Sequence, residues 1–114
     1  MYSVYISGAI EHNDNFVLDF TRAKIQLEKK GFRVLSPLDT KAHKNNLPAK
    51  FCMMEAVDML KDADMITVVT KDIPSAGMKI ELELAKYYEI PYVQYDILLQ
   101  EEKWKTDKKE CWTT

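Results

Sequence analysis

Short apolar segments alternate with helical patterns along most of this chain, and this alternation restricts the fold more than any other feature. The clearest apolar segment, Met65–Val69, is a continuous run typical of a strand buried on both faces of a parallel sheet. Three further segments have the β-branched and aromatic composition of strands, and the four predicted strands cover residues 2–7, 32–36, 65–69 and 91–95.

Three amphipathic helices are predicted between these strands. Asn13–Asn15, Pro48 and Ser75 supply start signals, and Gly31 supplies a left-handed stop signal for the first helix. The side chains expected to be buried recur at helical spacing: Phe16, Phe20, Ala23 and Leu27; then Met53, Val57 and Leu60; then Ile80, Leu84 and Tyr87. Residues 38–47 are predicted to form a loop, and residues 97–104 are compatible with a last helix.

This order of elements predicts a specific architecture. Strands joined by helices favour right-handed crossovers and a parallel sheet covered on both faces. We therefore predict an α/β fold with a Rossmann-like (flavodoxin-like) doubly wound parallel sheet of four to five strands in three α/β/α layers. Since 114 residues suit one compact unit, residues 1–114 are assigned to a single domain.

Composition and charge exclude several classes of function. Sixteen basic and eighteen acidic residues leave a formal charge of -2, which disfavours binding to a nucleic acid polymer. No apolar run approaches the roughly 20 residues that cross a bilayer, and the first residues show no basic leader, so neither a membrane anchor nor a signal peptide is expected. Cys52 and Cys111 form no C-x-x-C pair, which fits a cytoplasmic location. The two histidines and the scattered carboxylates suggest no metal site, and we expect no cofactor.

Two loops are expected at the carboxyl ends of the strands, where sheets of this kind bind ligands. Ser7–Ile10 contains Gly8, which would let backbone N–H groups approach an anion, although an ordinary turn explains the same residues equally well. The second loop, residues 74–77, leads into the third helix.

Glu81 is the candidate reactive group. Gly77, Glu81 and Ala85 are spaced four apart, so small residues flank a carboxylate on one helical stripe and leave a hollow beside it. The helix dipole would favour the ionised form, and an ionised, partly desolvated carboxylate can attack a sugar carbon. The alternative is a solvated acidic face in which Glu81 pairs with neighbouring lysines.

These segments together resemble the nucleoside 2-deoxyribosyltransferase superfamily, and most closely its nucleotide N-glycosidases and small uncharacterised bacterial and phage relatives. The resemblance spans residues 4 to 93 and rests on residues 5–10 (YISGAI), on Ala63-Asp64, and on residues 74–77 (PSAG) with Glu81 and Ala85. It implies that Glu81 is a nucleophile that forms a glycosyl ester, and that the Tyr5 hydroxyl orients it.

The resemblance also implies ligand-binding positions. Ser75 after a proline matches the serine with which the nucleotide glycosidases hold a 5′-phosphate, whereas the transferases carry an aspartate there, which would repel phosphate. Gly77 is expected to contact phosphate or sugar. Met53 could pack against a base, although core filling explains it equally well. Ser7, Gly8, Ala9 and Ile10 are expected to form the loop over the ligand.

Two positions depart from the family pattern. The aspartate that contacts the sugar falls on Ala56, and its neighbours Glu55 and Asp58 are turned away by about 100 and 200 degrees on a helix. The arginine that helps to hold phosphate falls on Glu11, which has the opposite charge.

The expected function is therefore cleavage of the N-glycosidic bond of a (deoxy)nucleoside 5′-monophosphate, with deoxyribosyl transfer as the less favoured outcome. The alternatives are a non-catalytic nucleotide-binding or sensing module and an interaction protein that retains only the fold. His12 and His43 are expected at the surface. Because relatives complete their sites with a neighbouring subunit, a homodimer or higher homo-oligomer is expected, with the segment containing Trp104 and Trp112 as a candidate contact.

Overall fold

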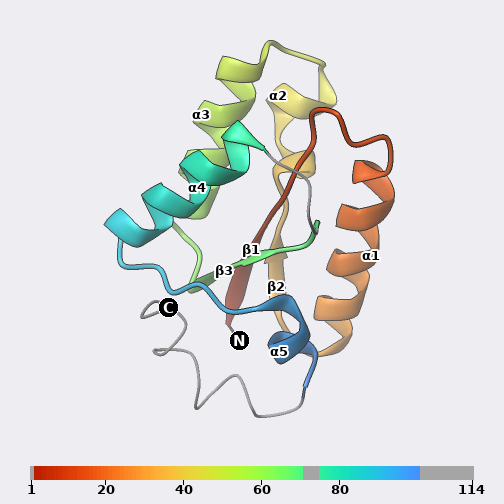
Figure 1. Cartoon of the computed structure of the whole chain (residues 1–114), viewed down its shortest axis with the longest axis vertical. Coiled ribbons are helices and arrows are strands. Elements are labelled where there is room, and N and C mark those ends of the chain that lie inside the picture. The colour runs from red at the N-terminus through yellow and green to blue at the C-terminus, as the bar shows by residue number, and fades with distance from the viewer. Residues whose placement is uncertain (1, 71–74, 101–114) are drawn as a thin grey trace.

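A three-stranded parallel sheet forms the centre of the molecule. The computed structural model describes residues 2–70 and 75–100. Its strands are β1 (Ser3–Ser7), β2 (Arg33–Leu35) and β3 (Met65–Val68), in the order β2-β1-β3 (Figure 1). The helices are α1 (Phe16–Lys29), η1 (Pro37–Asp39), α2 (Lys41–Lys44), α3 (Ala49–Leu60), α4 (Ala76–Tyr87) and α5 (Tyr95–Leu99). The predicted α/β class with a parallel sheet is confirmed.

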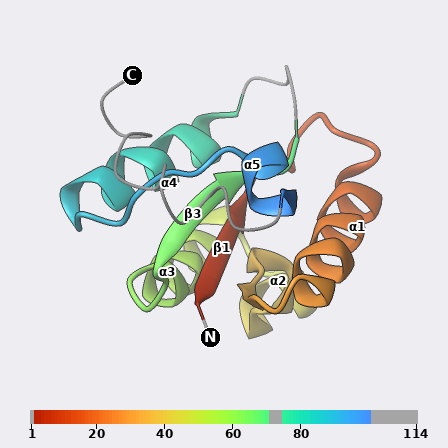
Figure 2. The same ribbon diagram turned by 90° about the horizontal axis from the view of Figure 1, so that it is seen from below.

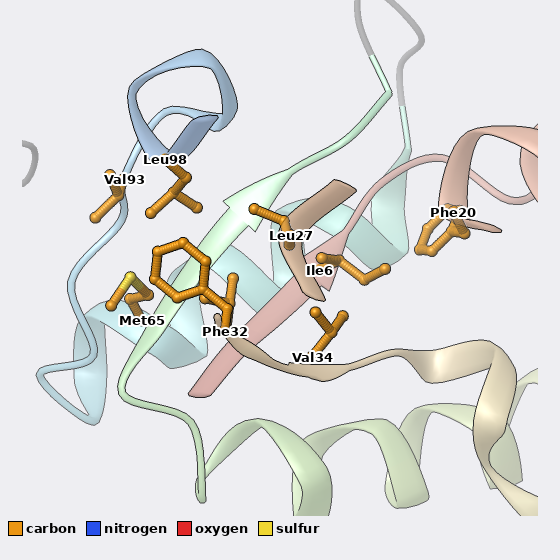
Figure 3. Close-up of a cluster of buried hydrophobic side chains, with 9 residues drawn as sticks. Ile6, Phe20, Leu27, Phe32, Val34, Met65, Val93 and Leu98 are labelled. Atoms are coloured by element: carbon orange, nitrogen blue, oxygen red, sulfur yellow. The ribbon is translucent and has the colours of Figure 1, made fainter. Parts of the chain in front are cut away.

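Helices cover both faces of this sheet. In the two views α1 and α5 lie on one side, and α3 and α4 lie on the other (Figures 1 and 2). Side chains alternate between the two faces along a strand, so the central strand β1 supplies both layers. Val4 and Ile6 pack toward α1, in the cluster shown in Figure 3, whereas Tyr5 packs with residues of α3 and α4.

Two of the expected helix signals have the predicted geometry. Gly31 has φ +92°, its N–H donates to Glu28, and the N–H of Phe32 reaches back to Leu27, which is the Schellman arrangement at the end of α1. Ser75 is the N-cap of α4, where its hydroxyl accepts a hydrogen bond from the Met78 N–H at 3.2 Å. The Ser75 hydroxyl thereby fixes the residue at which α4 begins.

The predicted count of four to five strands is wrong for the described residues. Residues 91–95 do not form a strand, because only Ile66 pairs with Tyr92 in an isolated parallel bridge. Ile66 donates to the Pro91 carbonyl, and the Val93 N–H donates back to Ile66. The chain then turns into α5, so the pairing ends after one residue.

The loop predicted over residues 38–47 contains two short helices instead, η1 and α2. Ser36 caps η1 through the N–H of Leu38, and Thr40 caps α2 through the N–H of His43. The polar composition of residues 38–47 predicted a loop. Ser36, just before this segment, and Thr40 within it instead act as helix caps.

The predicted buried face of α4 is also wrong. Ile80 is 47% exposed and Tyr87 is 81% exposed, and Leu84 is only half-buried. Glu81 and Ala85 are the buried residues of this helix. This side of α4 faces the sheet for two reasons. The small side chain of Ala85 lets the helix approach the sheet closely, and Tyr5 and Ser7 of β1 donate hydrogen bonds to Glu81.

No helix within residues 2–70 and 75–100 is both long enough and apolar enough to cross a membrane. The predicted last helix begins earlier than expected, at Tyr95, and ends at Leu99. Trp104 and Trp112, the expected subunit contact, lie outside the described residues.

Candidate active site

The Glu81 carboxylate lies where α4 crosses the carboxyl end of β1. Its side chain is buried, with 6% exposure, against the strand residues Tyr5 and Ser7. The Ser7 hydroxyl donates to Oε1 at 2.6 Å, and the Tyr5 hydroxyl donates to Oε2. Each carboxylate oxygen therefore has one donor, which fixes the plane of the group and leaves further lone pairs free.

This geometry arises from the period of a strand. Tyr5 and Ser7 are two residues apart and point to the same face of the sheet, toward α4. Both are fully buried, so neither hydroxyl competes with bulk water for the carboxylate. The solvated acidic face considered from the sequence is therefore wrong for Glu81.

Burial changes the acidity of both partners. Desolvation raises the pKa of Glu81, and the hydrogen bonds from Ser7 and Tyr5 lower it by less. Burial, followed by the adjacent Glu81 charge, raises the pKa of Tyr5 well above its ordinary value. Tyr5 thus remains a protonated donor, while the ionised Glu81 is held at elevated free energy. Desolvation, and not the helix dipole expected from the sequence, has the largest effect on this carboxylate.

Gly8 lets the loop after β1 approach the end of β3. A Cβ atom at Gly8 would lie 2.8 Å from both Cγ2 and Oγ1 of Thr70, a separation that real Cβ atoms do not adopt. The Ala9 N–H donates to Thr70 Oγ1 at 2.8 Å, and its carbonyl accepts from the Asn13 side chain at 2.9 Å. The loop is therefore anchored at both backbone groups of Ala9.

A cavity of about 180 Å³ opens beside Glu81. The segments that follow the carboxyl ends of β1 and β2 contribute to its wall, as the carboxyl-end rule predicts. The lining residues come from the β1 loop, η1, α2, α3 and α4: Gly8, Ile10, Glu11, Pro37, His43, Ala49, Cys52, Met53, Ala56, Ser75, Gly77, Met78 and Glu81.

Most of the predicted site residues meet at this cavity. Six of them line it: Gly8, Ile10, Met53, Ser75, Gly77 and Glu81. Tyr5 and Ser7 lie behind Glu81 and reach the cavity only through it. Ala9 is not among the lining residues, and both of its backbone groups are bonded within the protein, so neither is free to bind a ligand.

Five lining residues were not predicted from the sequence, and two of them, His43 and Cys52, carry reactive side chains; the others are Pro37, Ala49 and Met78. His43 was expected at the surface in a loop, but it belongs to α2 and is only half-exposed. One sequence feature could have identified His43: it follows the strand predicted over residues 32–36, and ligands bind at the carboxyl ends of strands in this type of sheet. His12, by contrast, is exposed and does not line the cavity.

The two departures from the family pattern both fall on the cavity wall. Ala56 is buried and lines the cavity, and neither Glu55 nor Asp58 on the same helix replaces the aspartate expected there. The Glu55 carboxylate accepts the N–H of Ala42, and Asp58 is exposed and pairs with Lys61. Glu11 adds a second negative charge to the wall.

Among the residues described, no lysine or arginine lines the cavity. The groups suited to an anion are the Ser75 hydroxyl and the first N–H groups of α4, which have no intrahelical acceptor. Within the same residues, no three His, Cys, Asp or Glu side chains gather closely enough to hold a metal ion.

Solved structures with the same fold include two enzymes that act on nucleosides or nucleotides. The 2-deoxyribosyltransferase of Bacillus psychrosaccharolyticus superposes with a TM-score of 0.61 at 19% identity, over 81% of this chain and 70% of that enzyme. The CMP N-glycosidase BcmB of Clostridium botulinum gives 0.57 at 18% identity, over 81% of this chain and 66% of that enzyme. The structural similarity expected from the sequence is confirmed at the level of the fold.

No curated protein matches the sequence. A family model described as "Domain of unknown function (DUF4406)" matches residues 2–94, which include every strand, α4 and all residues of the cavity wall. This chain is therefore a member of the DUF4406 family, built on the fold shared by a 2-deoxyribosyltransferase and a nucleotide N-glycosidase.

Proposed function

We propose that this protein is an N-glycosidase that cleaves a (deoxy)nucleoside 5′-monophosphate, with Glu81 as the nucleophile. The observation that carries this proposal is the buried Glu81 carboxylate, held by two hydroxyl donors at the wall of a cavity. A carboxylate fixed in this way is suited to attack on an anomeric carbon, because its orientation is set before the substrate binds.

The chemistry is that of a retaining glycosidase. The Glu81 carboxylate would add to the anomeric carbon as the bond to the base breaks, and water would then hydrolyse the glycosyl ester. Tyr5 and Ser7 would keep the carboxylate aligned. Two hydrogen bonds would also lower its basicity less than full solvation by water does. Deoxyribosyl transfer would result if a second base, in place of water, took the sugar.

The Ser75 side of the cavity supports a phosphorylated substrate. The Ser75 hydroxyl already accepts from Met78, so its own hydrogen remains available to donate to a phosphate oxygen. Gly77 lies beside it without a side chain, which leaves its backbone accessible. An aspartate at position 75 would repel this group.

A non-catalytic nucleotide-binding module is the second candidate. Two features favour it, namely the apolar Ala56 in place of a sugar-contacting carboxylate and the absence of lysine and arginine from the described cavity wall. Such a protein would bind a nucleotide in the same cavity without breaking the glycosidic bond.

The test is incubation of the full chain with a panel of ribo- and deoxyribonucleoside monophosphates, followed by chromatography for free base. We expect release of base from at least one compound and its abolition in Glu81→Gln. Base release by Glu81→Gln at the wild-type rate would contradict the assignment of Glu81. Calorimetric binding without release of any base would instead identify the binding module.

We also propose that the protein forms a homodimer or larger homo-oligomer. The observation that supports this is the exposed apolar side of α4, where Ile80 and Tyr87 face away from the core. Analytical ultracentrifugation at micromolar concentration tests it, and a monomer at every concentration would overturn it.

A further inference from the structure

His43 lines the cavity and is fixed by several contacts even though α2 contains only four residues. Its backbone N–H donates to Thr40 Oγ1 at 3.2 Å, and the preceding residue, Ala42, donates to the Glu55 carboxylate of α3 at 2.9 Å. Its ring meets the Phe16 ring edge-on, with centroids 6.0 Å apart. Contacts to α1 and α3 therefore position this imidazole.

His43 also differs chemically from the rest of the wall. The titratable side chains among the described lining residues are Glu11, Cys52, Glu81 and His43. Ionised carboxylates accept protons and a thiol is a weak donor, so His43 is the one member of this set whose ring nitrogens can both donate and accept a proton. The Tyr5 hydroxyl is committed to Glu81.

The proposed reaction needs such a group. When the bond between the anomeric carbon and the base breaks, its electron pair stays on the base nitrogen, and a base that leaves as an anion leaves slowly. A positioned acid that supplies a proton during this step contributes about 100-fold or more to the rate.

We propose that His43 is the proton donor to the leaving base, an inference that rests on the proposed function. The Glu81 carboxylate forms its bond to the anomeric carbon, the carbon–nitrogen bond breaks, and the imidazolium proton passes to the base. In the second step water adds to the same carbon, its proton goes to His43, and Glu81 departs as the carboxylate. The enzyme is then restored to its starting protonation.

The fold separates this role from phosphate binding. Ser75 and Gly77, the groups suited to a phosphate, lie on α4, whereas His43 lies on α2 (Figure 1). Glu81, where the sugar carbon would react, lies six residues after Ser75, about 1.7 turns further along α4. The base is therefore assigned to the wall formed by α2 and α3, and the phosphate to the start of α4.

The experiment compares two substrates of the full chain. One is a nucleotide that the wild-type protein cleaves, and the other is the para-nitrophenyl glycoside of the same sugar 5-phosphate, whose leaving group departs without protonation. We expect His43→Asn to lower kcat/KM on the nucleotide by about 100-fold and to leave kcat/KM on the nitrophenyl compound within about threefold of wild type. The ratio kcat/KM reports the steps up to loss of the leaving group and excludes the later step in which His43 takes a proton from water. His12→Asn is the matched control, because His12 is exposed and lies outside the cavity wall, and it should change neither rate.

Equal loss on both substrates would overturn the proposal, because it would mean that His43 binds the common sugar phosphate or supports the fold. Unchanged cleavage of the nucleotide would overturn it as well. A wild-type protein that cleaves neither compound would refute the proposed function itself, which separates that failure from a failure of His43. Thermal melting of His43→Asn shows whether a lost rate reflects lost folding.

Discussion

The two faces of strand β1 serve different purposes although their residues alternate along five positions of one chain. Val4 and Ile6 point into a dry apolar layer with Phe20 and Leu27 of α1 (Figure 3). Tyr5 and Ser7 point to the opposite layer, where their hydroxyls hold a buried carboxylate. One face gains stability from apolar burial, and the other keeps a charged group in a position that costs stability.

The α1 face of β1 stabilises the fold, whereas the α4 face holds the candidate reactive group. Apolar side chains buried on the α1 face each contribute on the order of 2 kcal/mol through removal from water. Burial of Glu81 acts in the reverse direction, as its raised pKa indicates. Charged side chains are rarely buried, and those that are buried with a shifted pKa occur most often at functional sites.

Glu81→Gln should change activity more than any other substitution considered below. A carboxamide is not a nucleophile, so the rate of base release should fall by on the order of 10³-fold or more. The fold should be retained, because glutamine has the same shape and its carbonyl still accepts a hydrogen bond. Chromatographic assays and circular dichroism check both statements.

The same variant gives a pH prediction. The folded-state pKa of Glu81 lies above the unfolded value, so this group favours folding fully below the ordinary glutamate pKa, and its contribution is lost as pH rises through the raised value. Glu81→Gln should therefore be at least as stable as wild type near neutral pH, and the advantage should shrink below about pH 4. Urea denaturation at both pH values measures this difference. A variant that is less stable near neutral pH would show that the carboxylate stabilises the fold.

On the other face, Leu27→Ala should lower the free energy of unfolding by about 2–5 kcal/mol, because Leu27 is fully buried and its removal leaves a cavity. Activity per folded molecule should stay near the wild-type value, since Leu27 has no contact with the site. Urea titration with an activity assay at low denaturant tests this, and a selective loss of activity would show that the two faces are coupled.

Gly8→Ala should affect both properties. The new Cβ would lie 2.8 Å from Thr70 and 3.3 Å from the Phe20 ring, so the loop must move away from β3. Overpacking of this kind costs about 1–3 kcal/mol, and displacement of the loop should also raise KM. Melting temperature and KM are the measurements, and unchanged values of both would show that the loop has room to shift.

Gly77→Ala is the matched control and should give the smallest effect. The nearest atom to a Cβ there is the end of the Met53 side chain at 3.4 Å, an ordinary contact. Alanine favours a helix over glycine by up to about 1 kcal/mol, so stability should rise slightly. KM should increase because the methyl group enters the cavity. A lower KM would contradict the placement of the ligand beside Gly77.

Local chemistry was enough to predict several features of the site. The helix caps depend on residues next to each other in sequence, which is why Ser75 and Gly31 were predicted correctly. Glu81 was identified as the candidate from the small residues spaced around it. Its contacts with Ser7 and Tyr5 join residues more than 70 positions apart, so spacing within α4 does not specify them.

The orientation of α4 could not be predicted in the same way. Its sequence has an apolar stripe through Ile80 and Tyr87, and simple periodicity places such a stripe against the core. The structure buries Glu81 and Ala85 instead and leaves Gly77 half-buried at the cavity wall. Glycine and alanine let the helix approach the sheet closely, and Ser7 and Tyr5 donate to Glu81 there.

The parallel α/β architecture, the ends of α1 and α4 at Gly31 and Ser75, and the candidate carboxylate could all be predicted from periodicity and neighbouring residues. The buried side of α4, the single-residue pairing of the expected fourth strand and the place of His43 in the cavity wall become visible only in the folded molecule. These features depend on contacts between distant segments, where the packing of small residues and the pairing of buried polar groups outweigh local preference.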